Sequence, residues 1–394
     1  MWKNMRKWLT AGGCSALILL GAGAGKLTAS GEETDWDVEA PHAVLMEVST
    51  GTILAEKDAD TPVHPASVTK VMTLLLIMEA LEQGRISLED QVVTSTYARS
   101  MGGSQVFLEE GEKQTVKTMI KCIVIASGND AAVAMAEHLE GSEEAFVRKM
   151  NERAAELGME HTHFTDCCGL TDSEEHYTTA RDVALMSREL LYCYPEITRY
   201  SSIWMEDIIH ETRRGSIPFT LTNTNKLLRS YEGCDGLKTG STLRAKYCLS
   251  ATAVRGGIRL ISVIMTAPDS KTRFRNAASL LDYGFGICRL YRDVHEDLLD
   301  PLRVKGGQSE TVGAVYEEEF TYLSTKTEDF NGITSELSMP ETVKAPVEEG
   351  QELGKRVYYL EGKEIGSTRI LAAEAVEQAD YRYCLGQIWK AFGL

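Results

Sequence analysis

The chain has 394 residues, of which 43% are hydrophobic and 25% are charged, and it contains 33 Gly and 9 Pro. This composition excludes collagen-like, low-complexity and wholly disordered proteins, and the length predicts two or three domains. The formal net charge is −17 at pH 7. Because an acidic surface repels phosphate backbones, we expect no nucleic-acid partner.

Residues 1–30 have the layout of an export signal. Lys3, Arg6 and Lys7 form a basic start, an apolar run follows at 9–20, and small residues come after it. A secretory signal peptide has this order of segments. A retained anchor is the alternative, but the run is short for a spanning helix, which needs about 20 residues. The sequence therefore predicts export.

The next segment is predicted to form two strands and a buried helix. Residues 42–49 and 52–56 are typical of strands joined at a Thr-Gly turn. A helix is predicted at 67–83, since Pro65 precedes it and Gly84 follows it. The central part of this helix is apolar on nearly every face, which predicts burial inside a domain.

A helical middle is expected next, followed by further strands and a last helix. Helices are predicted at 116–125, 130–139, 143–157 and 179–191. Strands are predicted at 236–241, 246–254 and 258–265, and the last helix at 272–283. Strands, an all-helical middle and then strands again are typical of an α+β core with one antiparallel sheet.

The pattern changes after about residue 293, where helical periodicity is lost. Short β-type runs predict a small all-β domain at 295–372, with strands at 311–316, 320–324, 356–360 and 364–371. The tail at 373–394 places Leu385, Ile388, Trp389 and Phe392 on one helix face. This face could pack on the domain or lie in a membrane interface, and the sequence favours the membrane.

Eight cysteines lie beyond the signal, and their spacing shows no small disulfide framework. An exported protein could pair them, but small buried thiols are the plainer interpretation. His161, His163, Cys167 and Cys168 are types that can ligate a metal, yet their spacing is not that of a standard zinc site. We therefore expect no metal and no cofactor.

Three short motifs carry residues that suit nucleophilic catalysis. In Ser67-Val68-Thr69-Lys70 the hydroxyl and the amine share one helix face, so the amine could take the hydroxyl proton if burial lowers its pKa. This motif alone recurs by chance. Ser127-Gly128-Asn129 is expected in a loop between helices, and Lys238-Thr239-Gly240 on a strand. The three in this order match the signature of penicillin-binding proteins and class A β-lactamases, with Gly128 in place of Asp.

From about His42 onward the chain resembles the serine-type D-alanyl-D-alanine carboxypeptidases, which are low-molecular-mass penicillin-binding proteins of the peptidase S11 type. Further matching segments are 65–70, 104–108, 169–172, 235–240, 270–274 and 345–351. The resemblance implies a penicillin-binding, β-lactamase-like transpeptidase domain at 31–292, with an antiparallel sheet and a helical subdomain. It also implies the all-β domain at 295–372 and a membrane-anchoring amphipathic helix at 373–394.

The same resemblance implies a role for each site residue. Ser67 would attack the D-Ala-D-Ala bond and form an acyl-enzyme, Lys70 would be its base, and Ser127 would relay a proton to the leaving amine. The substrate-binding residues would be Asn129, Lys238, Thr239, Gly240, Ser241 and Arg273. Among them, Thr239 and Arg273 would grip the terminal carboxylate. The backbone N–H groups of Ser67 and Ser241 would form the oxyanion hole.

The implied partners are peptidoglycan stem pentapeptides, β-lactam antibiotics and, through the tail, the outer face of the cytoplasmic membrane. A β-lactamase is an alternative, but Glu174 and Glu175 lack the context of its deacylating Glu. An inert cell-wall scaffold and a cross-link endopeptidase are further alternatives, and Arg273 favours a terminal D-Ala over a cross-link. Where the family often has Asn-Pro-His before Gly-Leu, this chain has Asp166-Cys167-Cys168.

Overall fold

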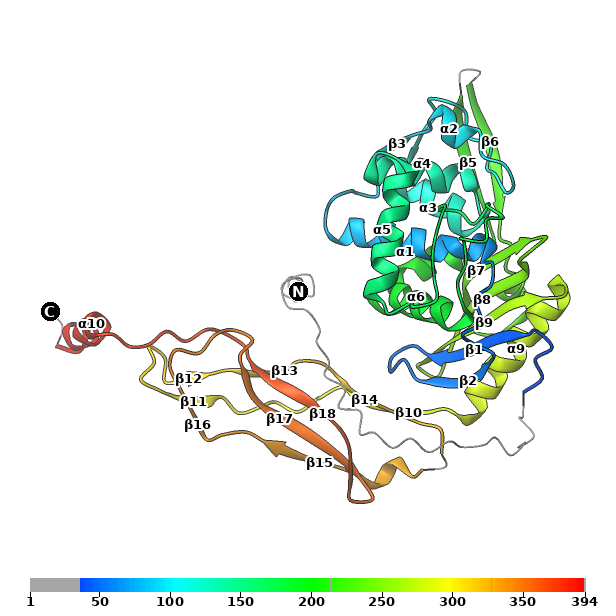
Figure 1. The fold of residues 1–394 in the computed structure, drawn as a ribbon. Helices are drawn as coiled ribbons and strands as arrows, with labels where there is room; N and C mark the ends of the chain where they lie inside the picture. Colours follow the sequence, from blue (N-terminus) through cyan, green and yellow to red (C-terminus); the bar gives the residue numbers. More distant parts are fainter. Residues whose placement is uncertain (1–35, 213–214, 327, 393–394) are drawn as a thin grey trace. The chain divides into compact units, whose positions relative to one another are not determined.

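The computed structural model describes residues 36–212, 215–326 and 328–392 (Figure 1). The expected export signal at 1–30 lies outside the described residues. Within these ranges, none of the helices combines the length and the apolar character that crossing a bilayer requires.

The centre of the N-terminal region is a five-stranded antiparallel sheet with the order β2-β1-β9-β8-β7. Its strands are β1 (His42–Glu47), β2 (Ile53–Lys57), β7 (Cys234–Thr242), β8 (Lys246–Arg255) and β9 (Ile258–Ala267). Alternate residues of a strand point to opposite faces. Val44 and Met46 accordingly enter one core while Ala43 and Leu45 enter another, so both faces of the sheet are covered.

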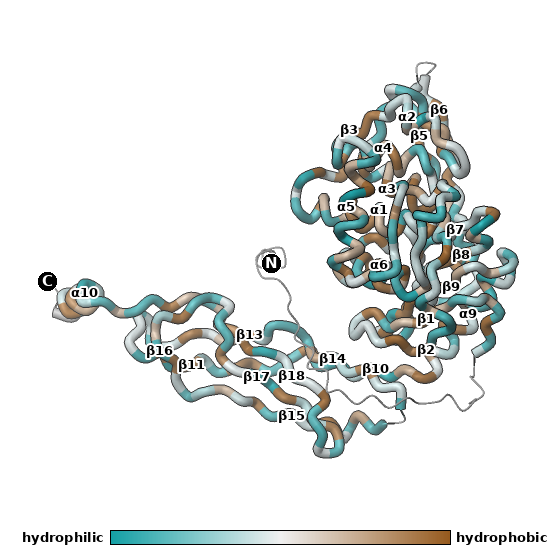
Figure 2. The backbone as a smooth tube through the Cα atoms, viewed as in Figure 1, coloured by the Kyte–Doolittle hydropathy of each residue, from teal (hydrophilic) through white to brown (hydrophobic). Residues whose placement is uncertain are grey.

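One of these cores lies between the sheet and the helical subdomain, in which α1 (Lys70–Glu82) is the central helix (Figure 1). Most α1 side chains are fully buried, as its apolar sequence predicts, and the tube is brown along such segments in Figure 2. The other helices are α2 (Thr96–Arg99), α3 (Val116–Val124), α4 (Asn129–Glu140), α5 (Glu143–Glu156), α6 (Ala180–Cys193) and α7 (Thr198–Ser201). The short strands β3 (Gln91–Val93) and β4 (Lys113–Thr115) pair beside them.

The opposite face of the sheet is covered by α9 (Ser270–Ile287), which packs on β8 and β9. Asp269 caps this helix by accepting a hydrogen bond from the backbone N–H of Thr272. At Gly284 an added Cβ would lie 2.6 Å from Leu260 and 2.8 Å from Leu45, so glycine lets helix and sheet approach closely. The expected α+β architecture with one antiparallel sheet is therefore confirmed.

One local expectation was wrong, and one hairpin was not expected. The helix expected from residue 67 begins at Lys70, because Ala66–Thr69 form a 3-10 turn, η1. The hairpin of β5 (Met205–Thr212) and β6 (Gly215–Thr222) was not expected. Burial alternates along β5, but hydropathy does not follow it, because His210 is buried whereas Met205 and Ile209 are exposed. The turn η2 (Pro195–Ile197) and the short helix α8 (Leu227–Ser230) flank this hairpin in the chain.

The C-terminal region is all-β, as expected, apart from the turn η3 (Phe330–Gly332). Its strands are β10 (Arg289–Asp293), β11 (Leu302–Lys305), β12 (Thr311–Val312), β13 (Ala314–Tyr316), β14 (Phe320–Ser324), β15 (Ile333–Ser338), β16 (Thr342–Lys344), β17 (Glu352–Leu360) and β18 (Lys363–Ala372). The strand expected at 311–316 is split into β12 and β13, and the expected final hairpin is β17–β18. β10 pairs with β14, so the pairing of this region begins before residue 295. The helix α10 (Tyr381–Phe392) follows.

The cysteines in the described ranges are free thiols, and most of them are buried. Cys122, Cys167, Cys168 and Cys248 are fully or almost fully enclosed. This agrees with the interpretation of the cysteines as small buried residues.

Candidate active site

The three sequence motifs converge on one point between the helical subdomain and the sheet. Ser67 lies on η1 and is half-buried, and Lys70 opens α1. The Lys70 Nζ lies 3.1 Å from the Ser67 Oγ, which is hydrogen-bond distance. The tight 3-10 turn thus brings the hydroxyl and the amine together, although Ser67 precedes the α-helix.

Lys70 is fully buried, and its other two contacts explain how it can act as a base. Its Nζ lies 2.6 Å from the Asn129 Oδ1 and 2.7 Å from the carbonyl oxygen of Cys168. Both oxygens can only accept hydrogen bonds, so a neutral amine donates its two hydrogens to them. Its lone pair then faces the Ser67 hydroxyl. Burial lowers the pKa of Lys70 and favours this neutral form.

A second buried amine lies next to the second motif. Lys238 on β7 donates from Nζ to the Ser127 Oγ and to the carbonyl oxygen of Thr239, each at 2.8 Å. Burial lowers the pKa of Lys238 well below its ordinary value, and the charges of Lys70 and Arg273 lower it further. The Ser127 hydroxyl therefore contacts a second buried amine, as the Ser67 hydroxyl contacts that of Lys70.

The N-terminus of α4 organises the other side of the site. Asn129 donates from Nδ2 to the carbonyl oxygen of Gly102 at 2.7 Å, and its backbone N–H donates to Ser104 at 2.8 Å. The next residue, Asp130, accepts hydrogen bonds from the backbone N–H groups of Val106 and Leu108. Two consecutive residues of α4 thus fix the whole loop from residue 102 to residue 108.

β7 is the edge strand of the sheet and passes directly against η1. An added Cβ at Gly240 would lie 2.9 Å from both the Pro65 oxygen and the Ser67 nitrogen, so only glycine fits there. Ala66, just before Ser67, has a φ of +47°, which is a strained value for a residue with a side chain. Tight packing of the strand on the turn holds this conformation.

The remaining predicted substrate-binding residues follow along β7 and behind it. The Thr239 Oγ1 lies 2.6 Å from the Thr224 Oγ1, and Ser241 is exposed at the strand end. The buried Arg273 guanidinium donates to the carbonyl oxygens of Gly240 at 3.0 Å and Cys248 at 3.1 Å. Burial lowers the pKa of Arg273 to about 10. Its grip on a substrate carboxylate stays a prediction.

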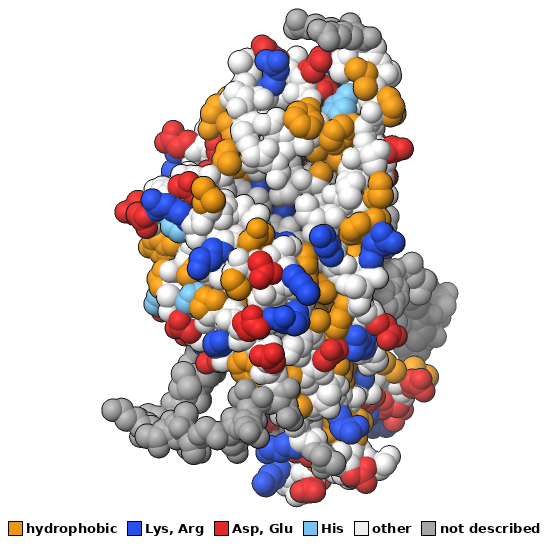
Figure 3. Space-filling model, turned by 90° about the vertical axis from the view of Figure 1, so that its right-hand side faces the viewer, with side chains coloured by type: hydrophobic (Ala, Val, Ile, Leu, Met, Phe, Trp, Pro, Cys, Tyr) orange, Lys and Arg blue, Asp and Glu red, His pale blue; other side chains and the backbone are white. Residues whose placement is uncertain are grey.

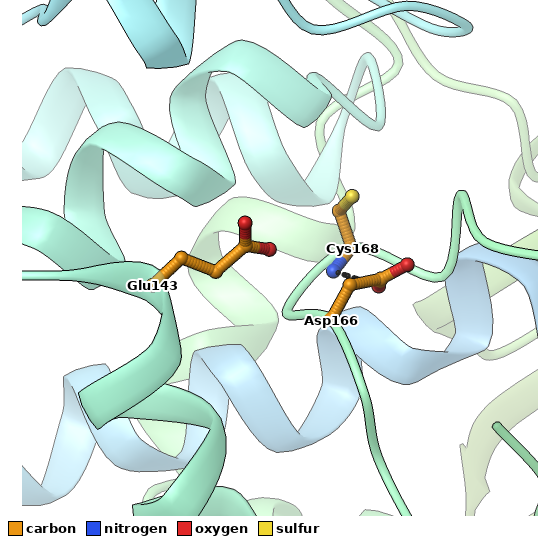
Figure 4. Close-up of side chains that lie close together, drawn as sticks. All are labelled: Glu143, Asp166 and Cys168. Atoms are coloured by element: carbon orange, nitrogen blue, oxygen red, sulfur yellow. Dashed lines mark hydrogen bonds between the residues drawn. The ribbon is translucent and has the colours of Figure 1, made fainter. Parts of the chain in front are cut away.

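A cluster of metal-ligating types lies near the site, but it differs from the one weighed in the sequence. It combines Glu143, Asp166 and Cys168, and it includes neither His161 nor His163 (Figure 4). Asp166 accepts hydrogen bonds from the backbone N–H groups of Cys168 at 2.9 Å and Thr171 at 2.8 Å, among others. Its carboxylate therefore shapes a loop.

Glu143 serves the same loop. It accepts hydrogen bonds from the Tyr97 hydroxyl at 2.7 Å and from the backbone N–H of Cys167 at 3.0 Å. The loop then presents two carbonyl oxygens to α1, that of Cys167 to the Thr73 hydroxyl at 2.5 Å and that of Cys168 to Lys70.

The sequence analysis did not identify His176, whose side chain contacts Thr69 of η1. Its Nδ1 accepts from the backbone N–H of Thr165 at 3.0 Å, so its Nε2 carries the hydrogen and donates to the Thr69 Oγ1 at 2.9 Å. Burial lowers the pKa of His176 and keeps it neutral. Glu174, weighed as a deacylating base, instead pairs with Arg244 and is largely exposed.

Comparison with known sequences agrees with this geometry. The sequence model of the D-alanyl-D-alanine carboxypeptidases, peptidase S11, matches residues 28–269. The chain belongs to this family. A second model, the C-terminal domain of penicillin-binding protein 5, matches residues 295–378. The expected fold, a penicillin-binding transpeptidase domain followed by a small all-β domain, is confirmed, as is the resemblance itself.

Individual relatives match over most of their length. The chain is 43% identical to the D-alanyl-D-alanine carboxypeptidase DacF of Bacillus subtilis (strain 168) over 87% of each chain. It is 33% identical to DacC of Escherichia coli (strain K12), over 89% of this chain and 88% of that one. The structure of penicillin-binding protein 5 from Haemophilus influenzae superposes with a TM-score of 0.68 at 30% identity, over 87% of this chain and 98% of that one.

Proposed function

We propose that this serine D-alanyl-D-alanine carboxypeptidase removes the terminal D-alanine from peptidoglycan stem pentapeptides, and that β-lactams acylate the same serine. The observation that carries the proposal is the Lys70 amine, held 3.1 Å from the Ser67 hydroxyl by two groups that can only accept. Family membership supports the substrate class.

The first half of the reaction is acyl transfer to Ser67. Its Oγ attacks the carbonyl carbon of the penultimate D-alanine while Lys70 takes the hydroxyl proton. The backbone N–H groups of Ser67 and Ser241 stabilise the oxyanion. The C–N bond then breaks, and the leaving amine receives a proton through Ser127. Water hydrolyses the acyl-enzyme in the second half and releases the shortened peptide.

The substrate lies along the free edge of β7, where backbone groups not used by β8 remain available. Asn129 binds the amide that joins the penultimate D-alanine to the residue before it. Thr239 receives the terminal carboxylate, and Arg273 supplies positive charge from behind the strand. This local charge counts because the chain is acidic overall, with a net charge of −17.

The test uses purified protein that lacks residues 1–30. It is incubated with diacetyl-L-Lys-D-Ala-D-Ala while D-alanine release is measured, and a parallel sample receives a fluorescent penicillin. We expect release together with a stable label on Ser67. A label without release would indicate a scaffold or another wall substrate, and rapid loss of the label with antibiotic hydrolysis would indicate a β-lactamase.

We further propose that residues 1–30 direct export, that residues 31–292 form the catalytic domain, and that α10 binds the outer face of the cytoplasmic membrane. Leu385, Ile388 and Trp389 share one helix face, and the side chains of Ile388 and Trp389 are more than half exposed. An unpaired apolar face that includes Trp suits a membrane interface. This exposure argues against packing of the face on the β domain at 295–372.

Ile388→Glu should weaken binding of the protein to phospholipid vesicles, because it places a charge in the apolar face. Deletion of residues 381–394 should abolish the binding. The matched control is Gln387→Glu, which adds the same charge on the opposite side of α10. Co-sedimentation with vesicles measures the effect, and equal binding by Ile388→Glu and the control would contradict the anchor.

A further inference from the structure

Phe107 lies on the loop that Asn129 and Asp130 hold, and it is unusual in two respects. Its side chain is 67% exposed, and its φ of +62° lies in the left-handed region, which is rare for a bulky residue. Exposure of a large ring and backbone strain are both unfavourable, and strain of this kind concentrates at functional sites. The segment 104–108 is also a motif to which the catalytic mechanism assigns no task.

The strain has an identified cause. The buried Asp130 carboxylate accepts hydrogen bonds from the N–H groups on both sides of Phe107, those of Val106 and Leu108, at 3.1 to 3.2 Å. These bonds turn the intervening residue outward. The Phe107 ring then rests edge-to-face on Phe219 of β6, with the ring centroids 6.0 Å apart.

The two rings form a small apolar surface, here called the aromatic shelf of Phe107 and Phe219. Figure 3 shows hydrophobic side chains gathered toward the end of the molecule that carries the β5–β6 hairpin. A stable protein interface buries roughly 800 Å² on each partner, far more than two rings can offer. The shelf therefore suits one small apolar group.

The aromatic shelf and the candidate active site share one loop, residues 102–108. The loop that carries Phe107 is held at Gly102 and Ser104 by Asn129, the same residue that binds Lys70. Under the proposed function, Asn129 binds the amide between the penultimate D-alanine and the residue before it. The side chain of that preceding residue therefore leaves the groove beside the loop.

We propose that the aromatic shelf of Phe107 and Phe219 binds the aliphatic part of the diamino acid that precedes D-Ala-D-Ala in the stem peptide. The inference rests on the proposed function and extends it to substrate choice. A chain of methylenes that covers an aromatic face lowers the free energy of the complex, because apolar surface is removed from water. A single methyl group is too short to reach the shelf. The enzyme then prefers stems with a long third side chain.

The experiment compares two substrates that differ only in this side chain, diacetyl-L-Lys-D-Ala-D-Ala and acetyl-L-Ala-D-Ala-D-Ala. Phe107→Ala should lower kcat/KM about ten-fold for the first substrate, mainly through KM, and leave the second unchanged. Phe107→Leu should restore most of the loss, because it keeps an apolar surface. The matched control is Ile209→Ala, an exposed residue on the opposite face of the hairpin from Phe219.

Acylation by fluorescent penicillin separates substrate choice from damage to the loop. Wild-type labelling in Phe107→Ala, together with a selective loss on the lysine substrate, supports the shelf. An equal loss on both substrates, or no loss on either, would overturn it while leaving the carboxypeptidase intact. Failure of the unchanged enzyme to release D-alanine would overturn the proposed function itself.

Discussion

Ser67→Ala should abolish D-alanine release, with kcat/KM falling at least about 10,000-fold, because the acyl-enzyme needs this hydroxyl. The Ser67 Oγ is the group that contacts the buried Lys70 amine, and it lies on the half-buried turn that β7 covers. The same change should remove covalent labelling by penicillin. Release assays and gel fluorescence measure the two effects.

A suitable control for Ser67→Ala is Ser230→Ala, which removes an exposed hydroxyl that donates to the carbonyl oxygen of Lys226. It should leave both activities at the wild-type level. Peptide mass spectrometry of the labelled protein locates the adduct. A penicillin adduct on another residue, or turnover that persists in Ser67→Ala, would refute the assignment of the nucleophile.

Lys70→Met should slow acylation by about 100- to 10,000-fold, the range by which a general base accelerates a reaction. Methionine keeps the length of the side chain but cannot take a proton. The rate constant for penicillin labelling measures this step without product release. Lys57→Met is the matched control, because the Lys57 amine also donates to a carbonyl oxygen, that of Val38 at 2.7 Å. Lys57 lies on β2, at the edge of the sheet opposite to β7.

The pH dependence of Lys70 has a defined sign. Burial lowers its pKa in the folded state, whereas the unfolded chain titrates near the ordinary value of about 10.4. The unfolded state therefore binds more protons between these two values, and the free energy of unfolding rises with pH in that window. Acylation also rises with pH as Lys70 becomes neutral. Lys70→Met should reduce both slopes, and unchanged slopes would exclude Lys70 as the base.

The convergence of the three motifs could be predicted because their functional groups lie in side chains at fixed spacing. Ser67, Lys70 and Ser127 were expected to meet. In the structure the buried amine of Lys70 contacts Ser67 and Asn129, and the buried amine of Lys238 contacts Ser127. The buried helix and the three long strands of the sheet were predicted for a similar reason. Their apolar residues repeat with the period of the element.

Other parts of the site could not be predicted because they involve backbone atoms or tertiary packing. The carbonyl oxygen of Gly102 binds Asn129, and that of Cys168 binds Lys70. Every residue has a carbonyl oxygen, so the sequence does not indicate which ones take part. The 3-10 turn at Ser67 depends on β7, which comes about 170 residues later in the chain and passes against it. The β5–β6 hairpin has little apolar alternation because Met205 and Ile209 lie on its exposed face whereas the polar His210 is buried.

The loop at Asp166-Cys167-Cys168 shows how a catalytic site can tolerate sequence drift. Thr73 and Lys70 of α1 bind the backbone carbonyl oxygens of residues 167 and 168, and every amino acid has such an oxygen. The path of the loop is set instead by Asp166 and Glu143, which bind its backbone N–H groups. Other side chains that fit the buried space could therefore replace the two thiols without any change in the backbone groups that meet Thr73 and Lys70.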